Sequence, residues 1–368
     1  MRFFHPLLAL LILLSGVGGA DPLPKLLAPH FRAPAEFAGT IGDYRSPLKF
    51  ADGSEVNTAA DWKRRREEIR KSWHELMGPW PDQVAKPTVE SLDEARDDGF
   101  TRRHVRIQIA PDRTTDDAYL LVPGGRGPFP AAVVVFYDAK TGIGQGKGKL
   151  RDFALQLTRR GFVTLSLGSA PETYYPSKEK CRLQPLSFHA YVASTCRNAL
   201  ANRSDVDASR IGIVGHSYGG KWAMFASCLD DGFACAAWSD PGIVFDEKRS
   251  NVNYWEPWYL GFEPGAARKP GIPTAANPRT GPYKKMIEQG RDLHELHALM
   301  APRPFLVSGG SEDPPERWVP LNHSIAVNKL LGFDGRVGMT NRKGHDPTEE
   351  SNEQIYAFFE HCLKGSRR

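Results

Sequence analysis

Residues 210–221 read RIGIVGHSYGGK, a β-branched apolar run that ends in the pattern Gly-x-Ser-x-Gly. The run is too short for a helix, and a helical pattern follows it from Trp222 to Leu229. Strand, sharp turn and helix are the context of a nucleophile elbow, which lifts the hydroxyl of Ser217 clear of a sheet. Gly215 and Gly219 are expected there because the strand and the helix pack almost in contact. The stretch therefore predicts a reactive serine at a helix N-terminus, against the alternative of an ordinary strand-to-helix turn.

The rest of the chain alternates continuous apolar runs with helical patterns. From Phe100 onward, an alternating apolar pattern first predicts an antiparallel hairpin. Buried strands are then expected at residues 131–136, 162–167, 234–238, 304–307 and 337–340. Uninterrupted apolar strands that alternate with helices indicate a mostly parallel central sheet with helices on both faces. Together with the elbow in mid-sheet, this order predicts an α/β protein with the α/β-hydrolase fold.

Three segments are expected along the chain. Residues 1–20 have a positively charged start, an apolar stretch and small residues at the end, which predicts a signal peptide and export to the periplasm or the cell exterior. Residues 21–97 are expected to be an extension with one amphipathic helix, because apolar residues recur at helical spacing after Thr58. Residues 98–365 would form the catalytic domain, with an aromatic-rich insertion at about 241–290.

Composition and charge exclude several classes of function. The formal net charge of +5 is spread along the 368 residues, and the basic run 63–66 is followed at once by two glutamates, so no nucleic-acid partner is expected. After the signal peptide, no apolar segment is long enough to span a membrane. The five cysteines lack metal-ligand spacing, and neither a metal nor an organic cofactor is predicted. Cys228 and Cys235 could form a disulfide or could be small buried residues.

The candidate catalytic residues follow from the chemistry of serine. A serine hydroxyl becomes a strong nucleophile only beside a base that is itself oriented by a carboxylate. The chain order expected for this fold is Ser, acid, His, with each residue on a loop after a strand. Of the eleven histidines, His345 alone has this order and context, because it follows the last strand and precedes the C-terminal helix. The acid stays open: Asp313 follows the penultimate strand and is favoured, Asp240 follows the strand before it, and Glu312 is a third choice.

Such a site also needs two backbone donors for a developing oxyanion and groups that hold the substrate. The N–H of Tyr218, the residue after the nucleophile, should be one donor, and the other should come from the loop that starts near Tyr137. Glycines recur at every second position of 142–148, which is typical of a flexible loop at the mouth of a site. In the insertion, Trp255 and Trp258 could stack on sugar rings or could belong to a small core of the insertion itself.

The elbow segment resembles one group within the α/β-hydrolase superfamily, the secreted carbohydrate esterases that include acetyl xylan esterase-like and glucuronoyl esterase-like proteins. Residues 215–221 read GHSYGGK and are similar to the Gly-Cys-Ser-Arg-x-Gly-Lys of glucuronoyl esterases. The resemblance implies that Lys221 contacts a uronate carboxylate, and that Asp240, at the position of the family's acid, or Asp313 completes the triad. Three positions depart from the pattern: Tyr218 replaces the arginine that helps to hold the oxyanion, His216 replaces cysteine, and the acid is aspartate.

These observations predict a secreted serine hydrolase that cleaves carboxylic esters through an acyl-enzyme, with a small-molecule or polysaccharide ester as substrate. The resemblance implies acetyl or glucuronoyl esters of plant or microbial polysaccharide. Two other hydrolases fit the same triad, namely a prolyl-oligopeptidase-like peptidase and a dienelactone hydrolase-like enzyme. The peptidases usually carry an upstream β-propeller, for which the roughly eighty residues between signal peptide and core are too few. A binding module that keeps the fold without activity is a further alternative.

Overall fold

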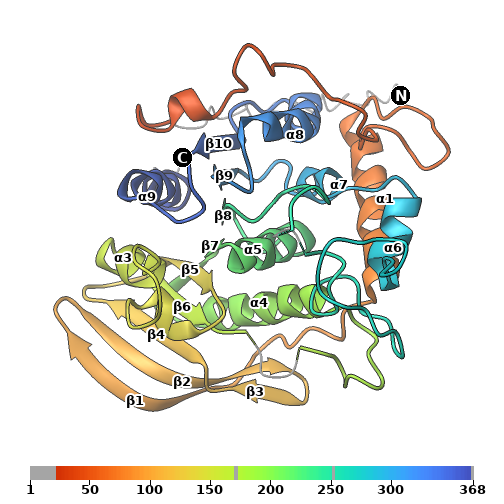
Figure 1. Cartoon of the computed structure of the whole chain (residues 1–368). Coiled ribbons are helices and arrows are strands. Elements are labelled where there is room, and N and C mark those ends of the chain that lie inside the picture. Colours follow the sequence, from red (N-terminus) through yellow and green to blue (C-terminus); the bar gives the residue numbers. More distant parts are fainter. Residues whose placement is uncertain (1–21, 170–172, 251–252, 366–368) are drawn as a thin grey trace, which may run out of the picture.

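The computed structural model describes residues 22–169, 173–250 and 253–365 (Figure 1). The predicted signal peptide, residues 1–20, lies outside the described residues. The described chain forms one central sheet between two layers of helices, as the sequence predicts. Among the described residues, no helix is both long and apolar enough to cross a membrane.

The sheet has ten strands in the order β1-β2-β4-β6-β5-β7-β8-β9-β10, and the short β3 pairs with β2. Strands β1 to β4 pair antiparallel with one another and with β6, whereas β5 to β10 are mutually parallel. The strands are β1 (Val89–Asp97), β2 (Phe100–Ala110), β3 (Arg113–Thr115), β4 (Ala118–Pro123), β5 (Phe129–Val135), β6 (Val163–Leu167), β7 (Val206–His216), β8 (Cys235–Ser239), β9 (Phe305–Gly309) and β10 (Val337–Asn341).

Helices cover both faces of the parallel strands (Figure 1). One face carries α3 and α9, and the other carries α4, α5, α7 and α8 with α1 outside them. The helices are α1 (Ala59–Met77), α2 (Ala139–Gly142), α3 (Phe153–Arg159), α4 (Pro185–Ala201), α5 (Tyr218–Leu229), α6 (Gly281–Glu288), α7 (His294–Ala298), α8 (Trp318–Leu330) and α9 (Glu349–Lys364), with 3-10 turns at Ala28–His30 and Pro315–Arg317.

The apolar strands are continuous because both of their faces are buried. Successive side chains of a strand point to opposite faces of the sheet. In β7, Ile213 packs with the helices on one face, and Val214 packs with those on the other. Val133 and Val134 of β5 divide in the same way. An alternating pattern would expose one face to water, so these strands need apolar residues at every position.

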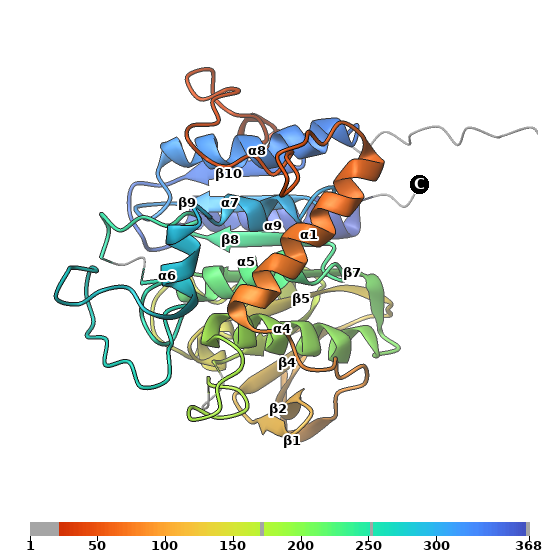
Figure 2. The same cartoon turned by 90° about the vertical axis from the view of Figure 1, so that its right-hand side faces the viewer.

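The predicted amphipathic helix is α1, and it lies across the helices of one face (Figure 2). Thr58 caps its N-terminus by accepting a hydrogen bond from the N–H of Asp61 at 3.0 Å. Its buried side chains are Trp62, Arg65, Ile69, Trp73 and Met77. The helix ends at Gly78, whose φ of 93° disfavours other residues.

One expectation about the chain needs correction, and one open choice is decided. The sheet begins with β1 inside the range 21–97 that was expected to be an extension, so this range contributes an edge strand to the main domain. The strand was missed because its residues are mostly polar and almost all of them are exposed. Cys228 and Cys235 are buried and unpaired, on α5 and β8, so the small-residue alternative holds for them.

The N-terminal segment is fixed to the domain by two buried histidines. Nε2 of His294 lies 2.6 Å from the carbonyl oxygen of Arg45, and Nε2 of His323 lies 3.1 Å from that of Ile41. The rings of His294 and His323 lie 4.9 Å apart between centroids, and Tyr44 packs against both. Burial lowers the pKa of His294 to about 4, because a charged imidazole would lose its hydration there.

This burial predicts acid sensitivity of the fold. The unfolded chain binds a proton at His294 near pH 6.5, whereas the folded protein binds it only near pH 4. The contribution to stability is therefore complete above about pH 6.5 and is lost as the pH falls toward 4, with a size on the order of 3 kcal/mol. His294→Gln keeps a donor for the Arg45 carbonyl but cannot titrate. Thermal unfolding from pH 7 to 4 should show a smaller fall in Tm for this variant than for wild type, and equal falls would contradict the prediction.

Candidate active site

Ser217 stands in the sharp turn between β7 and α5, at the carboxyl ends of the parallel strands. Its backbone has φ 58° and ψ −121°, a strained conformation for a residue with a side chain. A Cβ at Gly215 would clash with the carbonyl oxygen of Gly219, and a Cβ at Gly219 would clash with that of Val135. The two glycines are therefore required by the close contact of strand and helix, as the sequence pattern predicts.

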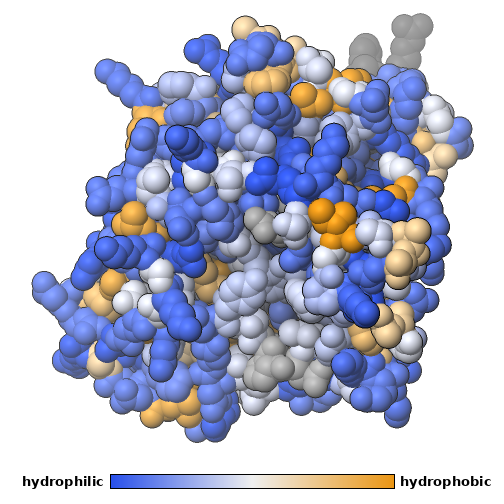
Figure 3. Space-filling view, in the orientation of Figure 1, coloured by the Kyte–Doolittle hydropathy of each residue, from blue (hydrophilic) through white to orange (hydrophobic). Residues whose placement is uncertain are grey.

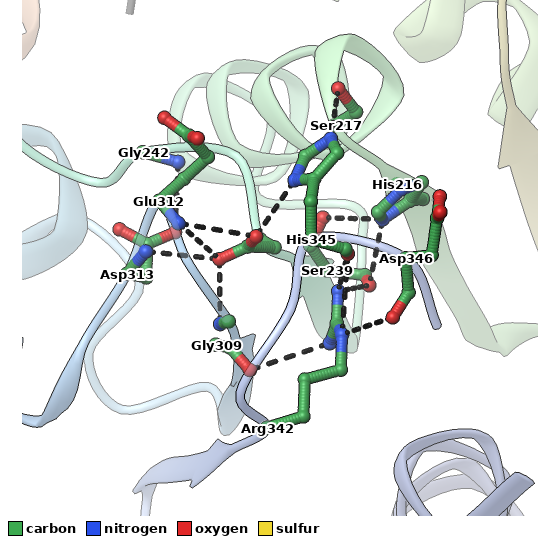
Figure 4. A network of polar contacts seen from close by, with 12 residues as sticks. His216, Ser217, Ser239, Gly242, Gly309, Glu312, Asp313, Arg342, His345 and Asp346 are labelled. Atoms are coloured by element: carbon green, nitrogen blue, oxygen red, sulfur yellow. Dashed lines mark hydrogen bonds and ion pairs between the residues drawn. The ribbon is translucent and has the colours of Figure 1, made fainter. Parts of the chain in front are cut away.

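His345 connects this serine to a buried carboxylate (Figure 4). Its Nε2 lies 2.9 Å from Oγ of Ser217, and its Nδ1 lies 2.7 Å from Oδ2 of Asp240. An ionised carboxylate only accepts hydrogen bonds, so Nδ1 carries the proton and Nε2 is free to accept the serine proton. Serine, imidazole and carboxylate are thus aligned in the order that nucleophile activation needs.

The Asp240 carboxylate is completely buried and is held by backbone donors. Oδ1 accepts hydrogen bonds from the N–H groups of Gly310 at 2.6 Å, Asp313 at 2.9 Å and Glu312 at 3.1 Å. Asp240 itself has a left-handed φ of 47°, which directs its side chain toward this loop. Charge-assisted bonds to the backbone replace the lost hydration, so the loop after β9 fixes the carboxylate without any cationic side chain in direct contact.

Asp313, the acid favoured from the sequence, lies elsewhere than expected. Its carboxylate accepts hydrogen bonds from the N–H groups of Gly242 at 2.8 Å and Ile243 at 2.7 Å, and no hydrogen bond joins it to His345. The loops after β8 and β9 therefore bind each other's aspartate. Burial, with the nearby charge of Asp240, raises the pKa of Asp313. The third choice, Glu312, forms an ion pair with Arg249 at 3.1 Å.

Three residues of the site were not anticipated as part of it. Arg342, directly after β10, donates to the carbonyl oxygens of His345 at 2.6 Å and Asp346 at 2.8 Å. The ring of His216, the residue before the serine, packs against that of His345 with 4.6 Å between centroids. Ser239 lies beside both, with its Oγ 3.1 Å from Nδ1 of His216 and 3.3 Å from the Arg342 guanidinium (Figure 4). No sequence pattern marks these positions apart from their places at strand ends.

The two predicted oxyanion residues come together beside Ser217. Tyr218 is the first residue of α5, where a backbone N–H has no partner within the helix. Its ring is buried, and its hydroxyl lies 2.7 Å from Nδ1 of His189. Tyr137 stacks on this ring with 5.2 Å between centroids and is 63% exposed.

Lys221 lies in the first turn of α5 and is only 4% exposed. Its ammonium nitrogen lies over two aromatic rings, 5.3 Å from the ring centroid of Tyr254 and 5.5 Å from that of Tyr259. Within the described part of the chain, no carboxylate forms an ion pair with it. Burial lowers its pKa to about 8, and the nearby charges of Asp313, Glu312 and Asp240 oppose this shift. A buried ammonium without a hydrogen-bonded anion is costly, so this position favours a ligand with negative charge or several hydroxyl groups.

The structure separates the two tryptophans of the insertion. Trp255 is completely buried among other aromatic residues of the segment. It belongs to a core, so the alternative that it stacks on a sugar ring is wrong. Trp258 is 42% exposed, and its carbonyl oxygen accepts a hydrogen bond from the Tyr218 hydroxyl at 3.5 Å. Tyr254 and Tyr283 are also buried with the main core, so most aromatic residues here have a packing role.

The carboxyl ends of the strands open onto a face that is mostly hydrophilic (Figure 3). The segment after β8 lies over these ends, as Figures 1 and 2 show together. Of the predicted loop 142–148, only Gly142 belongs to helix α2, and the rest forms turns and bends. Arg151 beyond it forms an ion pair with Asp346, next to His345. In the part of the chain that is described, no group of three or more His, Cys, Asp or Glu side chains could hold a metal ion.

The geometry predicts different roles for the two aspartates. An organophosphonate probe reacts with an activated serine hydroxyl, so its labelling rate measures the nucleophile without a chosen substrate. Asp240→Asn should slow labelling of Ser217 by about three to four orders of magnitude, because the imidazole loses its orienting carboxylate. Asp313→Asn, the matched control, should slow it less than about tenfold. Mass spectrometry of both variants measures this, and the reverse ranking would contradict the assignment of Asp240.

Comparison with known proteins gives one family match and several whole-chain likenesses. The model of the prolyl oligopeptidase family matches residues 193–366. A prokaryotic protein of unknown organism, Carbohydrate esterase MZ0003, is 21% identical over 87% of this chain and 89% of its own length.

Two solved structures extend the comparison. A glucuronoyl esterase from Solibacter usitatus is 20% identical, with a TM-score of 0.65 over 86% of this chain and 97% of its own. A putative acetyl xylan esterase from Bacteroides fragilis is 13% identical, with a TM-score of 0.57 over 86% of this chain and 87% of its own. The resemblance drawn from residues 215–221 is thereby confirmed at the level of the whole chain, which has the α/β-hydrolase fold.

Proposed function

We propose that this protein is a serine hydrolase that cleaves carboxylic esters of carbohydrates, with glucuronoyl esters preferred over acetyl esters. The observation that carries the proposal is the line of hydrogen bonds from the buried Asp240 through His345 to Ser217, at 2.7 and 2.9 Å. The carbohydrate esterases among the similar proteins support the substrate class. The strained Ser217 backbone gives further support, because such strain is typical of a nucleophile elbow.

The reaction would proceed in two steps. Oγ of Ser217 attacks the ester carbonyl while Nε2 of His345 takes its proton, and Asp240 stabilises the imidazolium that forms. The oxyanion accepts a hydrogen bond from the N–H of Tyr218, and the N–H of Tyr137 is the proposed second donor. His345 then protonates the leaving alcohol, and an acyl-enzyme remains. Water, activated by the same imidazole, releases the acid and restores the serine.

Lys221 favours a glucuronoyl group on the acyl side. An acetyl group offers the enzyme little besides its carbonyl, whereas a glucuronoyl group carries ring hydroxyls and becomes a carboxylate when the ester is cleaved. The unpaired ammonium of Lys221, in the first turn behind Ser217, would hydrogen-bond to such groups. Trp258 and Tyr137 present exposed aromatic rings beside the elbow and would pack against the sugar or the alcohol.

We also propose export from the cell, and a peptidase is the second candidate activity. The signal-peptide pattern of residues 1–20 supports release from the cell. The match of residues 193–366 to the prolyl oligopeptidase family favours a peptidase as the second candidate, because the same triad cleaves amides. Residues 22–88, ahead of the sheet, contain a 3-10 turn and α1 in place of the propeller that such peptidases usually carry.

A substrate panel tests the proposal. Wild type and Ser217→Ala are compared on p-nitrophenyl acetate, acetylated xylan, methyl glucuronate and a proline-containing amide. Wild type should turn over the esters, with the highest kcat/KM on the glucuronate, and the substitution should reduce kcat by about four to six orders of magnitude. Preferred cleavage of the amide would replace the esterase with the peptidase. Equal inertness of both proteins on all four compounds would favour the binding module.

Lys221→Met, which keeps the length of the apolar stem, tests the acyl preference in the same assay. The kcat/KM on methyl glucuronate should fall about 10- to 100-fold, because a charge-assisted contact is lost. The fall on p-nitrophenyl acetate should be much smaller. A uniform loss on both esters would show that Lys221 supports the elbow and does not select the acyl group.

A further inference from the structure

Arg342 makes many hydrogen bonds to the loops of the active site, and the roles assigned so far do not account for them. It follows β10 and lies three residues before His345. Its guanidinium donates to the carbonyl oxygens of His345 at 2.6 Å, Asp346 at 2.8 Å and Ser308 at 2.8 Å. It also reaches Oγ of Ser308 at 3.1 Å and Oγ of Ser239 at 3.3 Å. One side chain thus joins the ends of β8 and β9 to the loop that carries the imidazole (Figure 4).

The charge of this guanidinium has no direct counter-ion. Among the described residues, no carboxylate lies within ion-pair distance of Arg342; carbonyl and hydroxyl oxygens take its hydrogen bonds. Burial lowers its pKa, while the charges of Asp240, Asp313 and Asp346 raise it. A planar guanidinium with five N–H donors can hydrogen-bond to all of these carbonyl and hydroxyl oxygens, whereas a lysine ammonium could not reach all of them.

We propose that Arg342 is a positioning residue that fixes the His345 loop and holds the imidazole in line between Ser217 and Asp240. The inference rests on the proposed serine hydrolysis, in which His345 is the base. The residue does not act on the substrate itself, because all of its hydrogen bonds go to the protein. Its effect is carried by the two carbonyls of residues 345 and 346, which set the position of the ring between Ser217 and Asp240.

Three variants test the positioning role on a small ester such as p-nitrophenyl acetate. Arg342→Gln should lower kcat by about a hundredfold with KM within twofold, because the ring loses its position but no substrate contact. Arg342→Lys keeps the charge but cannot reach all of the acceptors, so its kcat should also fall. In Arg342→Ala, added guanidinium chloride at millimolar concentration should restore part of kcat.

Arg303 provides a matched control at the opposite end of β9. It is also a partly buried arginine, and it donates to the carbonyl oxygens of Ser227 at 2.9 Å, Asp230 at 3.0 Å and Phe233 at 3.0 Å. Unlike Arg342, it also forms an ion pair, with Asp231 at 3.1 Å. Arg303→Gln should lower Tm while kcat and KM at 25 °C stay close to wild type. Guanidinium should give it no increase in activity.

The outcomes distinguish this inference from the proposed function. If folded Arg342→Gln keeps its kcat, or if KM alone changes, Arg342 is not a positioning residue. A loss of Tm with kcat intact would reduce it to a structural clamp and also overturn the inference. If Ser217→Ala retains the activity of wild type, the proposed function fails instead, whatever the Arg342 variants show. Circular dichroism checks that each variant is folded before its kinetics are compared.

Discussion

The burial of the Asp240 carboxylate is the constraint on which the rest of the site depends. A carboxylate without water must be surrounded by donors, and three backbone N–H groups of the loop after β9 supply them. This requirement fixes the loop and explains why Gly310 is needed there, since a Cβ would clash with the carbonyl of Gly344 and crowd Asp240. In return, the loop after β8 binds the Asp313 carboxylate, so neither loop can move alone.

The sheet brings this carboxylate together with the serine and the imidazole. Strands β5, β7, β8 and β9 lie side by side and run parallel. Tyr137, Ser217 and Asp240 follow β5, β7 and β8, so they lie at the same edge of the sheet. His345 arrives from the next strand, β10, and Arg342 ties its loop back to β8 and β9. Helix α5 adds its N-terminal N–H groups, which favour a negative charge beside the serine. Catalysis as proposed needs only this edge, and the remaining helices hold the sheet in shape.

The sequence predicted the parts that local chemistry determines. The glycines of the elbow, the apolar strands and the position of His345 each follow from a short pattern with a physical cause. The choice between Asp240 and Asp313 could not be made, because both follow neighbouring strands and only the path of the loops decides which side chain meets the imidazole. Trp255 and Trp258 differ in burial although they share one segment, and Arg342 has no pattern of its own. These features depend on tertiary packing, which the pattern of residues along the chain does not determine.

The most direct test of the central claim is to trap the acyl-enzyme. Wild type is mixed with a slowly hydrolysed ester, quenched in acid within the first turnover and digested, and the peptide that contains Ser217 is examined by mass spectrometry. The triad geometry predicts an acyl group on Ser217, which accumulates in wild type and is absent from Asp240→Asn quenched at the same time. Ester turnover without acylation, or acylation of another residue, would contradict the assignment of Ser217 as the nucleophile.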